Sequence, residues 1–163
     1  MELYFRDNFF NAGRTEIMNE AGQPAGSVDL RSTFGSALDI YDYTGSIVCS
    51  GKLRFMANRW DLTAPSGSPL GTVRERLSFL SKRYEYDAGE GRGVYEITCP
   101  LFSKEYSIVS MTGDVVARFI QTSRWLESGA YCLQNGSQLL DEYVLVGVVM
   151  GVHTMQKNTQ GSF

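Results

Sequence analysis

Apolar and polar residues alternate along most of this chain in short runs separated by turn signals. Around residue 53, Leu53 and Phe55 are expected on one side of a strand, with Lys52 and Arg54 on the other. Such alternation is typical of half-buried β-strands, because successive side chains point to opposite faces of the sheet. Without an interrupting linker, residues 2–134 predict about twelve strands joined by short turns.

Two turn signals recur in step along these strands, each roughly every 23 residues. The glycine series is Gly22, Gly45, Gly67, Gly89, Gly113 and Gly136, and the aromatic series is Phe10, Phe34, Phe55, Phe79, Phe102 and Trp125. Glycine suits tight turns because it reaches positive φ without steric cost. The interleaved series therefore predict a chain built from one repeated β-hairpin unit.

A meander of this many strands must protect its edges, and closure into a barrel removes them. Wall side chains fill a barrel of only about eight strands. A barrel of about twelve strands therefore needs an element inside it, and the apolar segment Val144–Val152 at the end of the chain is the candidate. The fold class expected is mainly β: a closed antiparallel barrel filled by its C-terminal segment.

The residues alone leave the conformation of this segment open. Five valines and two glycines favour a strand over a helix. Asp141 and Glu142 would instead suit the first turn of a helix. Gly147 and Gly151 would share one helical face and permit close contact with the barrel wall. The apolar run is shorter than the roughly 20 residues of a membrane span, so no transmembrane segment is expected.

Composition is ordinary for a globular protein and predicts one domain over residues 1–163. A net charge of −3 argues against a nucleic-acid partner. The three cysteines, Cys49, Cys99 and Cys132, contain no CxxC pair and are expected to be buried, reduced thiols. The first residues show no secretory signal, so the cytoplasm is the expected location.

Catalytic and metal-binding patterns are missing from the sequence. His153 is the only histidine, which removes most catalytic triads and zinc sites, and it is expected to be a solvated or capping residue at a helix end. The glycines of residues 89–93 lack dinucleotide-binding spacing and indicate a hairpin tip. We therefore expect no catalytic residues, no cofactor and no metal, and a protein that is not an enzyme.

Clustered cations provide one functional indication. The candidate residues for binding anionic lipid or phosphate are Lys52, Arg54, Arg74, Arg76, Lys82 and Arg83. If their strands run side by side, they form a stripe on the outside of the barrel. The plainer alternative is a solvated surface with neighbouring acids. One shorter strand over residues 58–64 separates the strand of Lys52 and Arg54 from the strand of Arg74 and Arg76. These two strands should therefore lie about 10 Å apart.

The order and spacing of the repeated units resemble the LURP-one-related family of the tubby C-terminal-like superfamily, including its small bacterial members. The resemblance covers essentially the whole chain and rests on Phe9–Phe10 through Ile17 to Gly22, Leu38–Asp42 before Gly45, Leu80–Asp87, and Trp125 with Tyr131. It implies a central helix over about residues 138–155 after strands over about 2–134, followed by a short tail. Tubby domains bind phosphoinositides, but their basic clamp has no counterpart here, and no functional residue is transferred.

Two functions from different classes follow. The first is a non-enzymatic intracellular β-barrel that binds a protein partner or acts as a scaffold. The second is a lipid-associated protein that binds anionic headgroups through the basic stripe, or whose apolar C-terminal segment inserts into a bilayer. An enzyme is the weakest alternative, because no catalytic constellation is visible.

Overall fold

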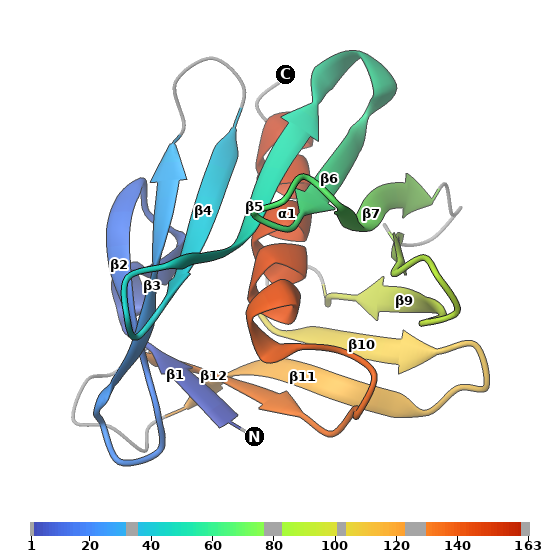
Figure 1. Cartoon of the computed structure of the whole chain (residues 1–163). Coiled ribbons are helices and arrows are strands. Elements are labelled where there is room, and N and C mark those ends of the chain that lie inside the picture. Colours follow the sequence, from blue (N-terminus) through green and yellow to red (C-terminus); the bar gives the residue numbers. More distant parts are fainter. Residues whose placement is uncertain (1, 32–35, 77–82, 101–103, 123–129, 161–163) are drawn as a thin grey trace.

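The structure, a computed structural model, describes residues 2–31, 36–76, 83–100, 104–122 and 130–160. Within these residues, antiparallel strands form a closed barrel around one long helix (Figure 1). The strands are β1 Glu2–Phe5, β2 Gly13–Met18, β3 Pro24–Arg31, β4 Ala37–Asp42, β5 Ile47–Arg54, β6 Arg59–Thr63, β7 Pro69–Arg76, β8 Arg83–Asp87, β9 Val94–Thr98, β10 Tyr106–Ser110, β11 Val115–Thr122 and β12 Ala130–Asn135. The predicted fold class is confirmed.

Each strand pairs with its neighbours in the sequence, and β1 closes the barrel by pairing with β12. The turns between consecutive strands therefore alternate between the two ends of the barrel. The predicted glycine turns are confirmed where backbone geometry demands glycine: Gly22, Gly45, Gly67, Gly89 and Gly113 all have positive φ. Of the aromatic series, Phe34, Phe79, Phe102 and Trp125 lie outside the described residues.

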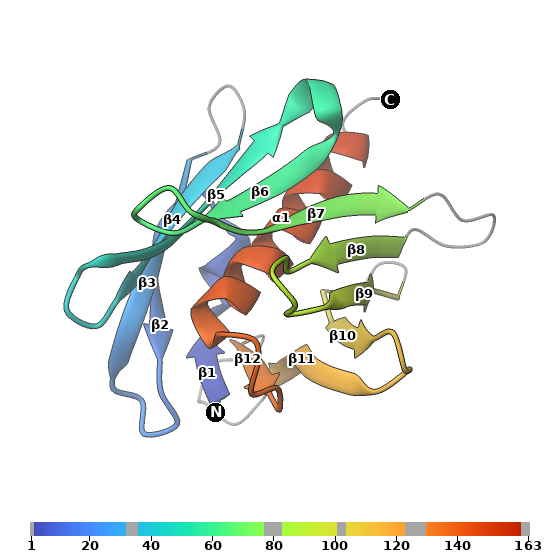
Figure 2. The same ribbon diagram turned by 45° about the vertical axis from the view of Figure 1, so that its right-hand side comes forward.

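The C-terminal segment is a helix, α1 Glu142–Gln160, which runs through the barrel interior (Figure 2). It begins four residues after the predicted start of 138 and continues five residues beyond the predicted end of 155. Asp141 fixes the start, because its carboxylate accepts hydrogen bonds from the backbone N–H groups of Tyr143, at 2.9 Å, and Val144, at 3.2 Å. This arrangement caps otherwise unpaired N–H groups at the helix N-terminus.

Close packing between α1 and the wall depends on two glycines, as the sequence predicted. A Cβ atom at Gly151 would lie 2.4 Å from Cδ1 of Trp60 on β6. At Gly147 it would lie 2.7 Å from Cδ2 of Leu62 on the same strand. Trp60, Leu62 and the helix residues from Leu145 to Val152 are buried, so the centre of the helix and the inner face of β6 share the core.

A short 3₁₀ helix, η1 Asp7–Phe10, adds aromatic rings to the core beside the later part of α1. Strand β1 ends at Phe5, and this helix follows it directly after Arg6. Phe10 packs against His153 with ring centroids 4.2 Å apart, and Phe9 packs against Phe119 at 5.4 Å. The prediction of a solvated or capping His153 is wrong, because α1 continues past this residue. Among the described residues, no helix has the length and apolar character needed to cross a membrane.

Candidate functional site

Five of the six predicted anion-binding residues lie on three strands of one region of the barrel. Lys52 and Arg54 are on β5, Arg74 and Arg76 on β7, and Arg83 at the start of β8, all of them exposed. Strand β6 lies between β5 and β7, as the sequence predicted. Lys82 lies outside the described residues.

Strand register places three arginines directly opposite one another on the outer surface. Arg54 on β5 is the partner of Arg59 on β6, and Arg59 is the partner of Arg74 on β7. Like charges at directly opposed positions of an antiparallel sheet destabilise the pairing. Lys52 lies two residues before Arg54 on the same side of β5. We call Lys52, Arg54, Arg59 and Arg74 the cationic face.

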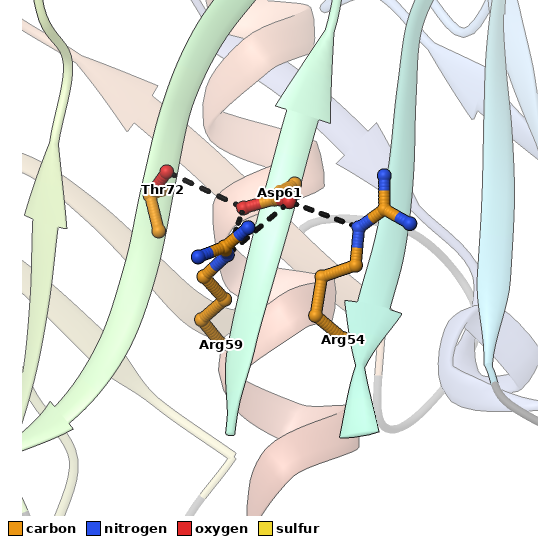
Figure 3. Close-up of polar contacts among 4 residues, drawn as sticks. All are labelled: Arg54, Arg59, Asp61 and Thr72. Carbon is orange, nitrogen blue, oxygen red and sulfur yellow. Dashed lines mark hydrogen bonds and ion pairs between the residues drawn. The ribbon is translucent and has the colours of Figure 1, made fainter. Parts of the chain in front are cut away.

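One carboxylate lies within this group (Figure 3). Asp61 on β6 accepts hydrogen bonds from Nε of Arg54, at 3.1 Å, and from Nε of Arg59, also at 3.1 Å. The Thr72 hydroxyl on β7 donates to the same carboxylate at 3.4 Å. Asp61 therefore organises two of the arginines and offsets only part of their charge. Within the described residues, Lys52 and Arg74 make no ion pair.

Arg76 and Arg83 do not extend the cationic face in the same way. They oppose each other across β7 and β8, and each also has an acidic partner. Arg76 Nη2 lies 2.9 Å from Glu85 Oε2, and Arg83 Nη1 lies 3.2 Å from Glu96 Oε1. The acids of β8 and β9 thus offset the charge at this side of the predicted stripe.

Sequence reasoning missed Arg59 and Asp61. Both lie in the shorter strand that was expected to separate the two cationic pairs. Alternation along β6, with Trp60 and Leu62 buried, places Arg59 and Asp61 outward. That alternation was visible in the sequence, whereas the alignment of Arg59 with Arg54 and Arg74 depends on the register of two strand pairs.

The cationic face continues into the β5–β6 turn. The turn contains a single 3₁₀ turn, η2 Phe55–Ala57, and Asn58 adopts a left-handed conformation with φ of 47° before β6 begins. Phe55 was expected on the buried side with Leu53, but strand alternation ends at Arg54, and Phe55 and Met56 are exposed. A shallow hollow of 360 Å³ is lined by cationic and apolar residues together: Lys52, Leu53, Arg54, Phe55, Met56, Ala57 and Arg59.

A second hollow, of 480 Å³, lies where α1 enters the barrel, at the end opposite the β5–β6 turn. Tyr43 and Tyr143 contribute aromatic rings, while Asp42, Asp141 and Arg92 are its charged residues. Asp42 already accepts hydrogen bonds within its own turn, and Asp141 caps α1. Its charges are mixed, so it lacks the single sign that distinguishes the cationic face.

Two titratable groups inside the barrel, the buried Cys49 and the partly buried His153, are held in their neutral forms. Burial, with smaller contributions from Asp141 and Asp39, raises the pKa of the Cys49 thiol to about 12. Burial, followed by the charges of Lys104 and Lys157, lowers the pKa of His153 to about 4. At neutral pH the first is a protonated thiol, a poor nucleophile, and the second a neutral imidazole. Over the described residues, no group of three His, Cys, Asp or Glu side chains has the arrangement of a metal site.

Comparisons with known proteins identify the same architecture. The sequence model of the LURP-one-related family matches residues 1–146. The crystal structure of a protein from Arabidopsis thaliana matches with a TM-score of 0.64, covering 95% of this chain and 90% of that chain at 12% identity. At this identity the likeness shows the fold alone. Comparison with curated sequences gives no match.

Proposed function

Because the chain belongs to the LURP-one-related family, which accounts for its barrel but assigns no role to its surface, we propose a function from the cationic face itself. The protein is a non-enzymatic binding protein that recognises anionic groups displayed on a partner surface. The observation that carries this proposal is the row of Arg54, Arg59 and Arg74, which lie opposite one another on neighbouring strands, with the Asp61 carboxylate paired to the first two.

This row is unfavourable for the fold taken alone. Opposed like charges oppose strand pairing. A neutral residue in place of Arg59 would remove both repulsive pairs, and one in place of Arg54 or Arg74 would remove one of them. An anionic partner would convert the same repulsion into attraction, because each guanidinium donates hydrogen bonds to phosphate or carboxylate oxygens. The chain has a net charge of −3, so the cationic face also contrasts with the charge of the molecule as a whole.

The geometry favours a partner with several anionic groups. Arg54 and Arg74 lie on strands separated by β6, which places their backbones about 10 Å apart. A single phosphate would bind both ends of such a row only if the two side chains converged, whereas separate anionic groups can meet each arginine where it extends outward. A surface of anionic lipid headgroups presents charges over this span, and we take it as the first partner to test.

The test compares the binding of the whole protein to phosphatidylcholine vesicles with and without phosphatidylserine, at low salt. Wild type is expected to bind the anionic vesicles and leave the neutral ones. The variant with Lys52→Gln, Arg54→Gln, Arg59→Gln and Arg74→Gln, which neutralises the whole cationic face, is expected to lose this binding. The matched control removes four exposed arginines elsewhere on the barrel: Arg6→Gln, Arg14→Gln, Arg31→Gln and Arg118→Gln.

The control variant is expected to retain binding, since it loses the same charge from other strands. Equal binding by wild type and the first variant would overturn the proposal. Equal loss in both variants would also contradict it, because binding would then depend on net charge and not on the cationic face. Circular dichroism of each variant checks that the barrel is intact.

Several expectations from the sequence stay predictions. These are the tubby C-terminal-like superfamily, the small bacterial-type subgroup, a single domain over 1–163 and a cytoplasmic location. A scaffold role toward a protein partner and the lack of enzymatic activity also stay predictions. The lipid interpretation has the additional support of the turn that adjoins the cationic face.

A further inference from the structure

We propose that the β5–β6 turn is a membrane wedge: Phe55 and Met56 insert into an anionic lipid bilayer while the cationic face binds the headgroups. This inference rests on the proposed function and deepens it, because it selects lipid bilayer as the source of the anionic groups. Its basis is the meeting of exposed apolar side chains and clustered cations at one end of the barrel.

The wedge residues are unusually exposed for large apolar side chains. Phe55 is 71% exposed, and Met56 is fully exposed at 102%. Leaving such side chains in water forgoes the free energy that burial would supply. Figures 1 and 2 show the β5–β6 hairpin reaching the top of the molecule, at the end of the barrel toward which α1 ends.

Cations adjoin the wedge directly. Arg54 precedes Phe55 in the sequence, Arg59 follows the turn, and both line the hollow that also contains Phe55 and Met56. A phosphatidylserine-rich surface has negative headgroups on the outside and an apolar layer beneath them. With the tip of the hairpin inserted, the cations would lie at the headgroups, and Phe55 and Met56 would lie in the apolar layer. Charge complementarity therefore identifies a bilayer as the occupant.

Other exposed apolar residues have the opposite electrostatic setting. Met111, 76% exposed, occupies the β10–β11 turn, in which Asp114 is the charged residue. Tyr43 and Leu139 line the hollow in which the carboxylates of Asp42 and Asp141 outnumber the single cation, Arg92. These turns lie at the other end of the barrel, because turns alternate between ends in a sequential meander. An anionic membrane would be attracted to the wedge and repelled by these carboxylates.

The experiment separates insertion from charge attraction. It measures binding of the whole protein to phosphatidylserine-containing vesicles and, separately, to heparin as a soluble polyanion without an apolar layer. The variant Phe55→Ser with Met56→Ser is expected to bind the vesicles about tenfold or more weakly. Its binding to heparin should equal that of wild type. Met111→Ser, the matched control, should leave both interactions unchanged.

The depth to which the β5–β6 turn enters the bilayer is measured with a tryptophan placed in the turn. Phe55→Trp is expected to gain fluorescence that brominated lipids quench when anionic vesicles are added, whereas Met111→Trp should show no such quenching. Vesicle binding that survives in the double serine variant, with no quenching at residue 55, would overturn the wedge and leave the proposed function intact. If wild type binds neither vesicles nor heparin, the proposed function fails and the wedge fails with it.

Discussion

The inner and outer faces of strands β5–β7 are formed by alternate residues of the same short segments, yet they are under different constraints. On the inner face, Leu53, Trp60 and Val73 are buried in the core, and Trp60 packs against Gly151 of α1. On the outer face, the intervening residues Arg54 and Arg74 are exposed. The strands thus present one surface that holds the barrel together and one that carries a row of opposed arginines.

The stability of the fold explains which residues occupy the inner face, but it does not explain the arginines of the outer face. Burial accounts for the identity of the inner residues, since removing large apolar side chains from water stabilises the fold. No comparable gain accounts for three opposed arginines, because exposed ion pairs such as those of Asp61 contribute at most about 1 kcal/mol each. The outer face is therefore the part of the barrel for which a binding role is the better explanation.

The largest expected effect comes from charge inside the barrel. Val148 on α1 is fully buried, so Val148→Asp would place a carboxylate in the core without a partner. We expect it to reduce the free energy of unfolding by about 3 kcal/mol or more. Val115→Asp is the control, since Val115 is exposed on β11. Urea unfolding measures both, and equal stability of the two variants would contradict the buried position of α1.

A smaller inner-face effect should distinguish the two helix glycines. Gly151→Ala brings a methyl group against the rigid ring of Trp60 and is expected to cost about 2 kcal/mol. Gly147→Ala meets the end of the flexible Leu62 side chain instead. The helix propensity of alanine, worth about 1 kcal/mol over glycine, should then leave Gly147→Ala near neutral. A more severe loss at 147 than at 151 in urea unfolding would show that the helix packs differently.

His153 should make the core sensitive to acid. Its pKa falls from 6.5 to about 4 on folding, because burial disfavours the charged imidazole, and Lys104 and Lys157 add to the effect. The unfolded chain therefore binds the proton more readily, so this contribution to stability is complete above pH 6.5 and is lost as pH falls toward 4.

Because His153 keeps some exposure, we expect it to account for a loss of about 1 to 2 kcal/mol between pH 7 and pH 4.5. The measurement is the difference in free energy of unfolding between wild type and His153→Gln at each pH, which cancels the carboxylates that titrate over the same range. A difference that stays constant with pH would contradict a partly buried, neutral imidazole.

The smallest change in stability is expected at the outer face, where it should accompany a change in binding. Asp61→Asn removes the carboxylate that accepts from Arg54 and Arg59, with an expected cost of about 1 kcal/mol. The same substitution leaves both arginines available, so phosphatidylserine vesicles should bind more tightly. The control is Asp39→Asn, which removes the β4 carboxylate that pairs with Arg31 of β3. It should not strengthen vesicle binding. Weaker binding by Asp61→Asn would mean that Asp61 orders the arginines for the ligand.

Much of the barrel could be predicted because its signals are local. Positive-φ glycines such as Gly45 mark the turns, and alternation marks the inner face of each strand. The helix required the resemblance to a family, because the valines of Val144–Val152 favour a strand when considered without their packing. Phe55 was misplaced because alternation fails where a strand ends in a 3₁₀ turn.

The candidate site depended more strongly on information that is not local. Lys52, Arg54 and Arg74 were found from the sequence as cations in strands. The row through Arg59 depends on the registers of β5 with β6 and of β6 with β7, and the second register shifts between Leu62 and Thr63. A one-residue change in register alters which side chains oppose one another, so composition and alternation do not determine the row.

The most direct test of the division between the two faces reverses one charge at a time. Arg74→Glu and Arg118→Glu alter exposed arginines on the outer sides of β7 and β11, with the same change in net charge. The measurement is the affinity of each variant for phosphatidylserine vesicles at low salt, with the free energy of unfolding determined alongside. We expect Arg74→Glu to weaken binding about tenfold, Arg118→Glu to change it less than about twofold, and both to unfold within about 1 kcal/mol of wild type. Equal weakening by the two variants would contradict a binding role for the outer face of β5–β7.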